Sequence, residues 1–134
     1  ADLPADRTID RKDIQDLLFG VPGAETPYEA FYYYQGPQLQ AVRSGPWKLY
    51  LSLEENVRTG EPQETQLYNV VDDPGETTDV IDQHPNIVTE IRTHAKHARA
   101  ELGDVGHGGS GQRQVGRVNN PTPQVPCPWN GTCR

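Results

Sequence analysis

The sequence predicts an α+β fold in which a small four-stranded antiparallel sheet packs against one C-terminal amphipathic helix. Short aromatic and aliphatic segments alternate with Gly/Pro turns between residues 29 and 70, which is typical of consecutive strands joined by turns. Apolar residues then recur with helical spacing between residues 87 and 102. The segment that follows is rich in Gly, Pro and polar residues, so we expect an irregular tail with no core of its own.

The first 28 residues are expected to contain one short helix and a loop. Asp10 can cap a helix over Arg11–Phe19, and Gly20 is a natural stop. Two prolines and two glycines mark residues 20–28 as a loop.

Four strands are expected to follow. The clearest is Trp47–Leu53, where apolar residues alternate with Lys48, Tyr50 and Ser52. This alternation gives the strand one apolar and one polar face. The charged segment 54–65 is expected to be an exposed loop, and residues 72–75 a tight turn. The other expected strands are Glu29–Tyr34, Leu39–Ser44 and Gln66–Val70.

The main helix is expected to begin near Pro85 and to end at Gly103, because proline suits a first turn and glycine a C-terminal stop. Residues 29–104 therefore form the predicted sheet-plus-helix subdomain, between an N-terminal region of residues 1–28 and a tail of residues 105–134. We expect the glycine-rich run Gly106–Gly111 to be a flexible link. One apolar stripe of the helix should cover the sheet: Ile87, Val88, Ile91, Ala95, Ala98 and Leu102.

The overall composition argues against two classes of partner. The net charge is −7, and no basic cluster is evident along the chain, so we expect no nucleic-acid partner. No segment approaches the ~18 consecutive apolar residues of a membrane span, so we expect no membrane segment.

Two motifs that resemble chemical sites have plainer explanations. His94 and His97 lie three residues apart on the expected helix, but on the side opposite its apolar stripe, so we favour a solvated surface over a metal site. The run Ser44–Lys48 resembles a nucleophile motif of the form Cys/Ser-x-Pro-x-Arg. It falls in an expected hairpin turn, whereas a nucleophile of this kind should open a helix, whose N–H groups lower its pKa.

Charged and aromatic residues on the strands allow two interpretations each. Arg43 and Lys48 can pair with acids of the turn at residues 72–76; we favour structural ion pairs over an anion site. The tyrosines of residues 32–34 can pack within the sheet or stack on a ring of a ligand. A polar aromatic edge beside Tyr50 is a candidate for lining a pocket in a larger protein.

The tail holds Cys127 and Cys133, which flank a short Pro/Gly-containing loop. They are a candidate disulfide, which would require an oxidising compartment, or two free thiols; the spacing leaves both open. Asn130 begins an N-glycosylation sequon in the same loop. No further Cys or His is spaced for zinc.

An ordered set of segments resembles the C-terminal end of the arylsulfatases, members of the alkaline-phosphatase-like superfamily. The resemblance covers about residues 4–121, and no single motif decides it. The segments are Ile9-Asp10, Asp13-Ile14, Leu17-Leu18, Gly20, Glu29–Tyr33, Leu39–Leu49, Leu67–Asn69, Asp73–Glu76, His84-Pro85, Ala98–Asp104, Val115–Val118 and Asn120-Pro121.

This resemblance implies a chain that is part of an enzyme. Sulfatases hydrolyse sulfate esters with a formylglycine and a calcium ion, and both belong to an α/β domain upstream of the part that this chain resembles. The resemblance therefore implies no catalytic residue, cofactor or metal ligand in this chain, whose partners would be its own sulfatase catalytic domain and a sulfated substrate. It also implies a secreted or periplasmic location.

Four residues are candidates for the rim of the parent's substrate pocket: Tyr33, Tyr34, Gln38 and Tyr50. Two positions depart from the family pattern. Arg11 stands where the family usually has Gly, and Tyr50 where it often has His; a phenol can hydrogen-bond a substrate but cannot take up a proton near neutral pH. The alternative function is a stand-alone binding module for sulfated glycans or a protein partner.

Overall fold

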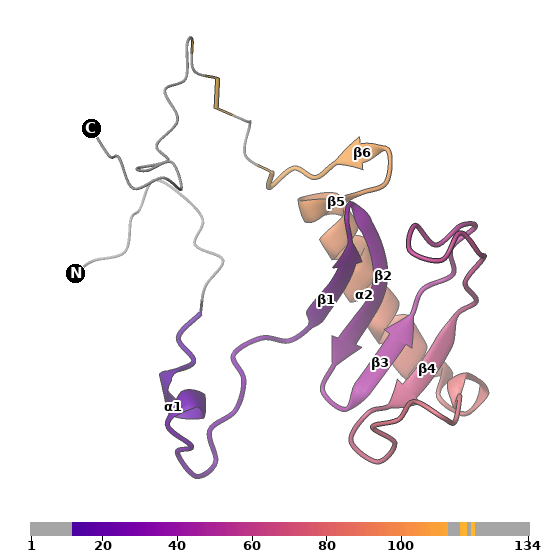
Figure 1. Cartoon of the computed structure of the whole chain (residues 1–134). Helices are drawn as coiled ribbons and strands as arrows, with labels where there is room; N and C mark the ends of the chain where they lie inside the picture. Colours follow the sequence, from indigo (N-terminus) through magenta and orange to yellow (C-terminus); the bar gives the residue numbers. More distant parts are fainter. Residues whose placement is uncertain (1–11, 113–115, 118, 120–134) are drawn as a thin grey trace, which may run out of the picture.

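The protein is an α+β structure in which one long helix covers one face of a four-stranded antiparallel sheet (Figure 1). The computed structural model describes residues 12–112, 116, 117 and 119. Cys127, Cys133 and the sequon at Asn130 lie outside the described residues, as does the predicted cap Asp10.

The strands of the sheet follow one another in chain order, β1-β2-β3-β4, and every neighbouring pair is antiparallel. The β1–β2 pairing contains an irregularity between Tyr33 and Tyr34. The strand predicted to reach Leu53 ends at Tyr50, and beyond it an isolated antiparallel bridge pairs Leu53 with Gln63. The strands are β1 (Phe31–Gln35), β2 (Gln38–Ser44), β3 (Trp47–Tyr50) and β4 (Gln66–Asn69).

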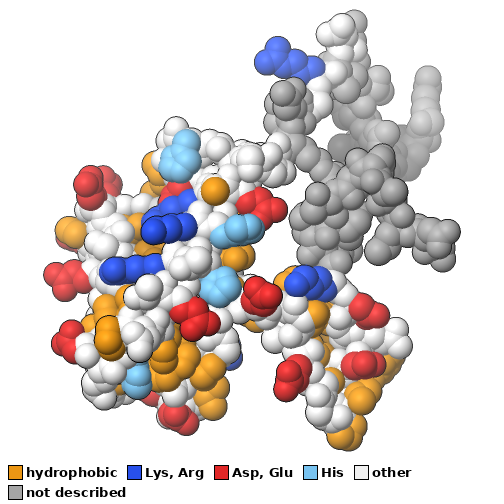
Figure 2. Space-filling model, turned by 180° about the vertical axis from the view of Figure 1, so that it is seen from behind, with side chains coloured by type: hydrophobic (Ala, Val, Ile, Leu, Met, Phe, Trp, Pro, Cys, Tyr) orange, Lys and Arg blue, Asp and Glu red, His pale blue; other side chains and the backbone are white. Residues whose placement is uncertain are grey.

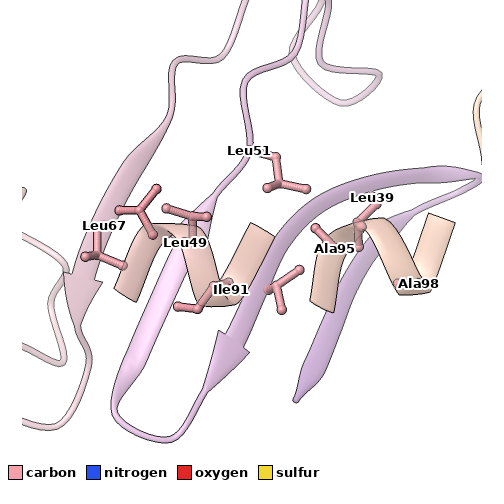
Figure 3. Packing of buried hydrophobic residues seen from close by; sticks show 9 residues of the cluster. Leu39, Leu49, Leu51, Leu67, Ile91, Ala95 and Ala98 are labelled. Atoms are coloured by element: carbon pink, nitrogen blue, oxygen red, sulfur yellow. The ribbon is translucent and has the colours of Figure 1, made fainter. Parts of the chain in front are cut away.

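The apolar core of the described residues lies between the sheet and helix α2 (Pro85–Leu102). Figure 3 shows side chains of the strands meeting side chains of α2 in this layer. The alternation predicted for β3 is confirmed, because Leu49 is fully buried while Lys48 and Tyr50 are only partly so. The core residues are Leu39, Val42, Leu49, Leu51, Leu67, Val88, Ile91, Ala95 and Ala98.

The start and the end of α2 agree with the predicted signals. Pro85 occupies the first turn, after a short 3₁₀ turn, η1 (Ile81–Gln83), and Gly103 follows the last residue with φ 95°. The ring of His84, just before the helix, packs 4.6 Å from the ring of Trp47. No helix in the described part of the chain is long and apolar enough to cross a bilayer.

The glycine-rich run after α2 is not the flexible link that we expected. Strand β5 (Gly103–Asp104) pairs with β6 (His107–Gly108), and the chain then folds back onto the helix end. The N–H groups of Ser110 and Gly111 donate to the carbonyls of Ala100 and Glu101 at 2.9 and 2.8 Å. These bonds satisfy carbonyls that a helix C-terminus leaves without partners. Gly109 must be glycine, since a Cβ there would collide with the carbonyl of Glu101.

The N-terminal helix is shorter than predicted and does not join the core. Helix α1 (Gln15–Leu18) spans a single turn, and Asp13 accepts a hydrogen bond near its start (2.9 Å to the N–H of Gln15). It buries no residue, and Leu18 and Phe19 are 75% and 77% exposed. Figure 1 shows α1 standing apart from the sheet and α2.

Candidate functional site

The face of the sheet that points away from α2, here called the outer face, gathers aromatic and charged side chains. Strand register places Tyr33, Ala41 and Tyr50 in one cross-strand row. The adjacent row contains Phe31, Arg43, Lys48 and Tyr68. Such cross-strand neighbours lie close enough for their side chains to interact.

Lys48 is at the centre of this face. Its ammonium lies 4.9 Å from the ring centre of Tyr33 and 4.6 Å from that of Tyr50, both within cation–π range. It donates to the hydroxyl of Tyr50 at 2.8 Å and to Oε1 of Glu76 at 2.7 Å. The preference for structural ion pairs over an anion site is thus supported, because a carboxylate from the turn already neutralises this charge.

The hydroxyl of Tyr50 completes a closed triad of Lys48, Tyr50 and Glu76. It accepts from Lys48 and donates to Oε2 of Glu76 at 2.7 Å. A phenol has one donor and two acceptor positions, so within the triad its donor is used and one acceptor position remains. Tyr50 can therefore accept a hydrogen bond from a ligand hydroxyl, but it cannot donate to a sulfate unless the bond to Glu76 breaks.

Glu76 reaches the triad from a tightly organised turn. Its φ of 53° makes it the one non-glycine residue with positive φ in the described part of the chain. Both N–H groups that follow it are held by Oδ2 of Asp73, at 2.7 Å for Thr77 and 2.9 Å for Thr78. Left-handed backbone is unfavourable for residues with a Cβ, so the turn and the two bonds to Glu76 hold this conformation.

The triad shifts the pKa of each member. Burial alone would raise the pKa of Glu76, but the hydrogen bonds from Lys48 and Tyr50 lower it overall. Burial alone would lower the pKa of Lys48, and the same bonds raise it overall. Burial raises the pKa of Tyr50 overall, although the hydrogen bond from Lys48 lowers it and the bond to Glu76 raises it. All three shifts favour a charged Lys–Glu pair bridged by a neutral phenol.

The four residues predicted for a pocket rim divide between two places. Tyr33 and Tyr50 lie together on the outer face, and Tyr33 is 41% exposed. Tyr34 packs on the core side, where its hydroxyl donates to the carbonyl of Gly103 at 2.9 Å. Gln38 is buried; its side chain donates to the carbonyl of Glu55 at 2.7 Å and accepts from the N–H of Val57 at 3.0 Å.

The two motifs that resembled chemical sites show no catalytic arrangement. Ser44 ends β2 at the turn into β3, and its hydroxyl donates to the carbonyl of Glu29 at 2.9 Å, so the expected hairpin turn is confirmed. His97 lies 3.5 Å from Glu101 on the exposed side of α2. Among the residues that the structure describes, no group of three or more His, Cys, Asp and Glu side chains is placed to hold a metal ion.

A second surface was missed from the sequence. Three basic residues that are separated along the chain, Arg92, Lys96 and Arg99, meet on one side of α2 and line a groove of about 190 Å³. Their spacing of four and three residues places them on one helix face. The signal lies in helical periodicity, because these residues form no contiguous basic run in the sequence.

Comparison with known proteins identifies the family. Residues 26–134 match the model described as the C-terminal region of aryl-sulfatase. A sulfatase structure from work on the metabolism of multiple glycosaminoglycans by Bacteroides thetaiotaomicron has a similar fold, with 24% identity and a TM-score of 0.55 over 73% of this chain. The match covers 22% of that protein's chain, so this chain spans about a fifth of its length. No curated protein matches. The chain belongs to the family of sulfatase C-terminal regions.

Proposed function

We propose that this chain is the C-terminal subdomain of a sulfatase, that it braces the catalytic domain and lines the edge of the substrate pocket, and that it is inactive alone. The family match supports the assignment as a sulfatase C-terminal subdomain. The match covers only 22% of the solved relative's chain, which supports the need for a further domain. Formylglycine, calcium and the chemistry of ester hydrolysis would then belong to that domain. A secreted or periplasmic location is part of the same proposal.

The observation that carries the rim assignment is the outer face itself. Tyr33 offers an exposed ring beside a Lys48–Tyr50–Glu76 triad that fixes its surroundings. An exposed ring on a rigid strand is suited to stacking on a sugar or aryl group. We assign direct contact to Tyr33 and Tyr50, with Tyr50 accepting from a neutral hydroxyl of the substrate.

Tyr34 and Gln38 act as positioning residues in this proposal. The hydroxyl of Tyr34 joins β1 to the end of α2, and the amide of Gln38 holds the loop of residues 54–65. Both side chains use their polar groups inside the subdomain. They would support the rim without touching the substrate.

Two experiments test the proposal. The isolated chain should show no turnover of an aryl sulfate such as 4-nitrophenyl sulfate, and measurable hydrolysis by it would overturn the assignment as a non-catalytic part. In the full-length parent enzyme, Tyr33→Ala should lower kcat/KM by about two- to thirteenfold, because aromatic stacking is worth about 0.5–1.5 kcal/mol.

The matched control for the rim is Val57→Ala. Val57 is 51% exposed and lies on the loop of residues 54–65 rather than on the outer face. Its truncation should leave kcat/KM within about twofold of the parent value, as expected for an exposed residue outside the site. Equal losses in both variants would count against a rim at Tyr33.

A further inference from the structure

The groove beside α2 combines basic side chains with hydroxyl groups over an apolar floor. Its floor is formed by Leu51 and Ala95, which are 5% and 2% exposed. Ser52 and Thr65 line it from the sheet side. Figure 2, which views the molecule from the side of α2, shows Lys and Arg side chains gathered on this helix. The groove lies on the opposite side of the sheet from Tyr33 and the triad.

Two of the three basic residues of the groove carry charge that the subdomain does not neutralise. Arg99 is paired with Asp104, with 2.6 Å between Nε and Oδ2. Arg92 and Lys96 form no ion pair with any other described residue, and both are exposed. Like charges one helical turn apart destabilise a helix. In a chain of net charge −7, this local excess of positive charge points to an anionic ligand.

We propose that the groove binds a sulfate group of an anionic oligosaccharide, at a site separate from the pocket rim. Arg92 and Lys96 would supply the charge, and the hydroxyls of Ser52 and Thr65 would donate hydrogen bonds to sulfate oxygens. The floor of Leu51 and Ala95 suits the apolar face of a sugar ring. The choice of sulfate over other anions rests on the proposed function. The inference that the groove binds an anion does not depend on that function.

The competing explanation is that the basic residues are structural. Long Arg and Lys stems cover apolar surface while their charged ends stay in water, and here they would shield Leu51 and Ala95. This explanation requires the aliphatic stem but not the charge. Replacing Arg92 and Lys96 by glutamine keeps part of the aliphatic stem and a polar end group but removes the charge, so the two explanations give different outcomes.

The test is a titration of the whole 134-residue chain, followed by NMR chemical shifts at low ionic strength. The probes are a heparin hexasaccharide, the same hexasaccharide after desulfation, inorganic sulfate and hexaglutamate. We expect the sulfated sugar to shift resonances of residues around the groove and to bind at least about fivefold more tightly than each of the others; a fivefold ratio corresponds to about 1 kcal/mol.

Substitutions then localise the binding. The double variant Arg92→Gln/Lys96→Gln should weaken binding of the hexasaccharide at least about fivefold, since each exposed charge pair contributes up to about 1 kcal/mol. The control Lys12→Gln/Arg58→Gln removes the same net charge from exposed positions outside the groove and should weaken binding less than twofold, roughly. Thermal unfolding of each variant checks that the fold is retained.

Several results would overturn the proposal. Equal losses in the two double variants would indicate attraction to net charge alone. Equal affinity for the desulfated sugar would exclude a sulfate site, and equal affinity for hexaglutamate would favour an acidic protein surface as the partner. If the hexasaccharide did not bind at low salt, the basic side chains would be explained by their cover of Leu51 and Ala95 alone. None of these results bears on whether the isolated chain hydrolyses an aryl sulfate, so the two proposals fail separately.

Discussion

Neutralising Glu76 tests the central role that the structure gives to the triad. In the variant Glu76→Gln, Lys48 keeps a hydrogen-bond acceptor but loses its ionic partner. The Lys48 side chain is 15% exposed and that of Glu76 24%, so the pair is neither on the open surface nor fully buried. Loss of the ionic bond to Lys48 also removes one of the interactions that stabilise the left-handed backbone (φ 53°) at residue 76.

The expected cost lies between two known limits. Exposed ion pairs contribute about 0–1 kcal/mol, and breaking a fully buried pair costs about 3–5 kcal/mol. Because this pair is mostly but not completely shielded, and because glutamine retains a hydrogen bond, we expect Glu76→Gln to lower the free energy of unfolding by about 1–2 kcal/mol. Urea unfolding at pH 7, monitored by circular dichroism, measures this change in the free energy of unfolding.

A matched control and a double-mutant cycle make this result specific. Glu61→Gln is the same chemical change on an exposed loop residue and should cost less than about 0.5 kcal/mol. Combining Glu76→Gln with Lys48→Met should reveal a coupling energy of about 1 kcal/mol. If Glu76→Gln cost no more than the control, or if the coupling fell below about 0.3 kcal/mol, our account of the triad would be refuted.

Three further predictions concern the core, the helix end and pH. Leu49→Ala should lower the free energy of unfolding by about 3 kcal/mol, because Leu49 is fully buried; urea unfolding checks this, with the 43% exposed Leu102→Ala as control. Gly109→Ala should lower the melting temperature through its clash with the carbonyl of Glu101, whereas Gly116→Ala, with no neighbouring atom within 4 Å, should not. The pKa of Glu76 is lower in the folded chain than its ordinary value of 4.5, so its stabilising effect is complete above pH 4.5 and is lost as the pH falls through the folded pKa. The free energy of unfolding, measured between pH 6 and 2, should therefore fall less in Glu76→Gln than in the parent chain.

Much of the sheet and the main helix could be predicted, because local patterns determine them. Alternation along β3 and the apolar stripe of α2 each mark one buried face, and Pro85 and Gly103 mark the helix ends. The last residue of the predicted stripe, Leu102, is the exception, because it is 43% exposed. The segment after Gly103 could not be predicted in the same way. Its order depends on hydrogen bonds to carbonyls of the last helical turn, and a glycine-rich composition does not distinguish a close backbone approach from a mobile linker.

The candidate site shows the same division between local and long-range information. The sequence indicated that Arg43 and Lys48 would pair with acids of the turn at residues 72–76, and Lys48 does pair with Glu76. Arg43 instead donates from Nε to the carbonyl of Gly45. The sequence did not indicate that Tyr50 would join Lys48 and Glu76, or that Tyr34 would point into the core layer. The pairing partners of a side chain depend on strand register and on the irregularity between Tyr33 and Tyr34, and neither is encoded in one segment.

The chain-order arrangement β1-β2-β3-β4 has a consequence for how the subdomain is made. Each strand pairs with the one synthesised just before it, so the sheet needs only short loop closures, and such low contact order favours fast folding. Helix α2 follows the four strands and supplies the apolar cover. Until α2 leaves the ribosome, Leu49 and its apolar neighbours on the newly formed strands face water. A pause in translation before residue 85 would therefore expose an aggregation-prone intermediate.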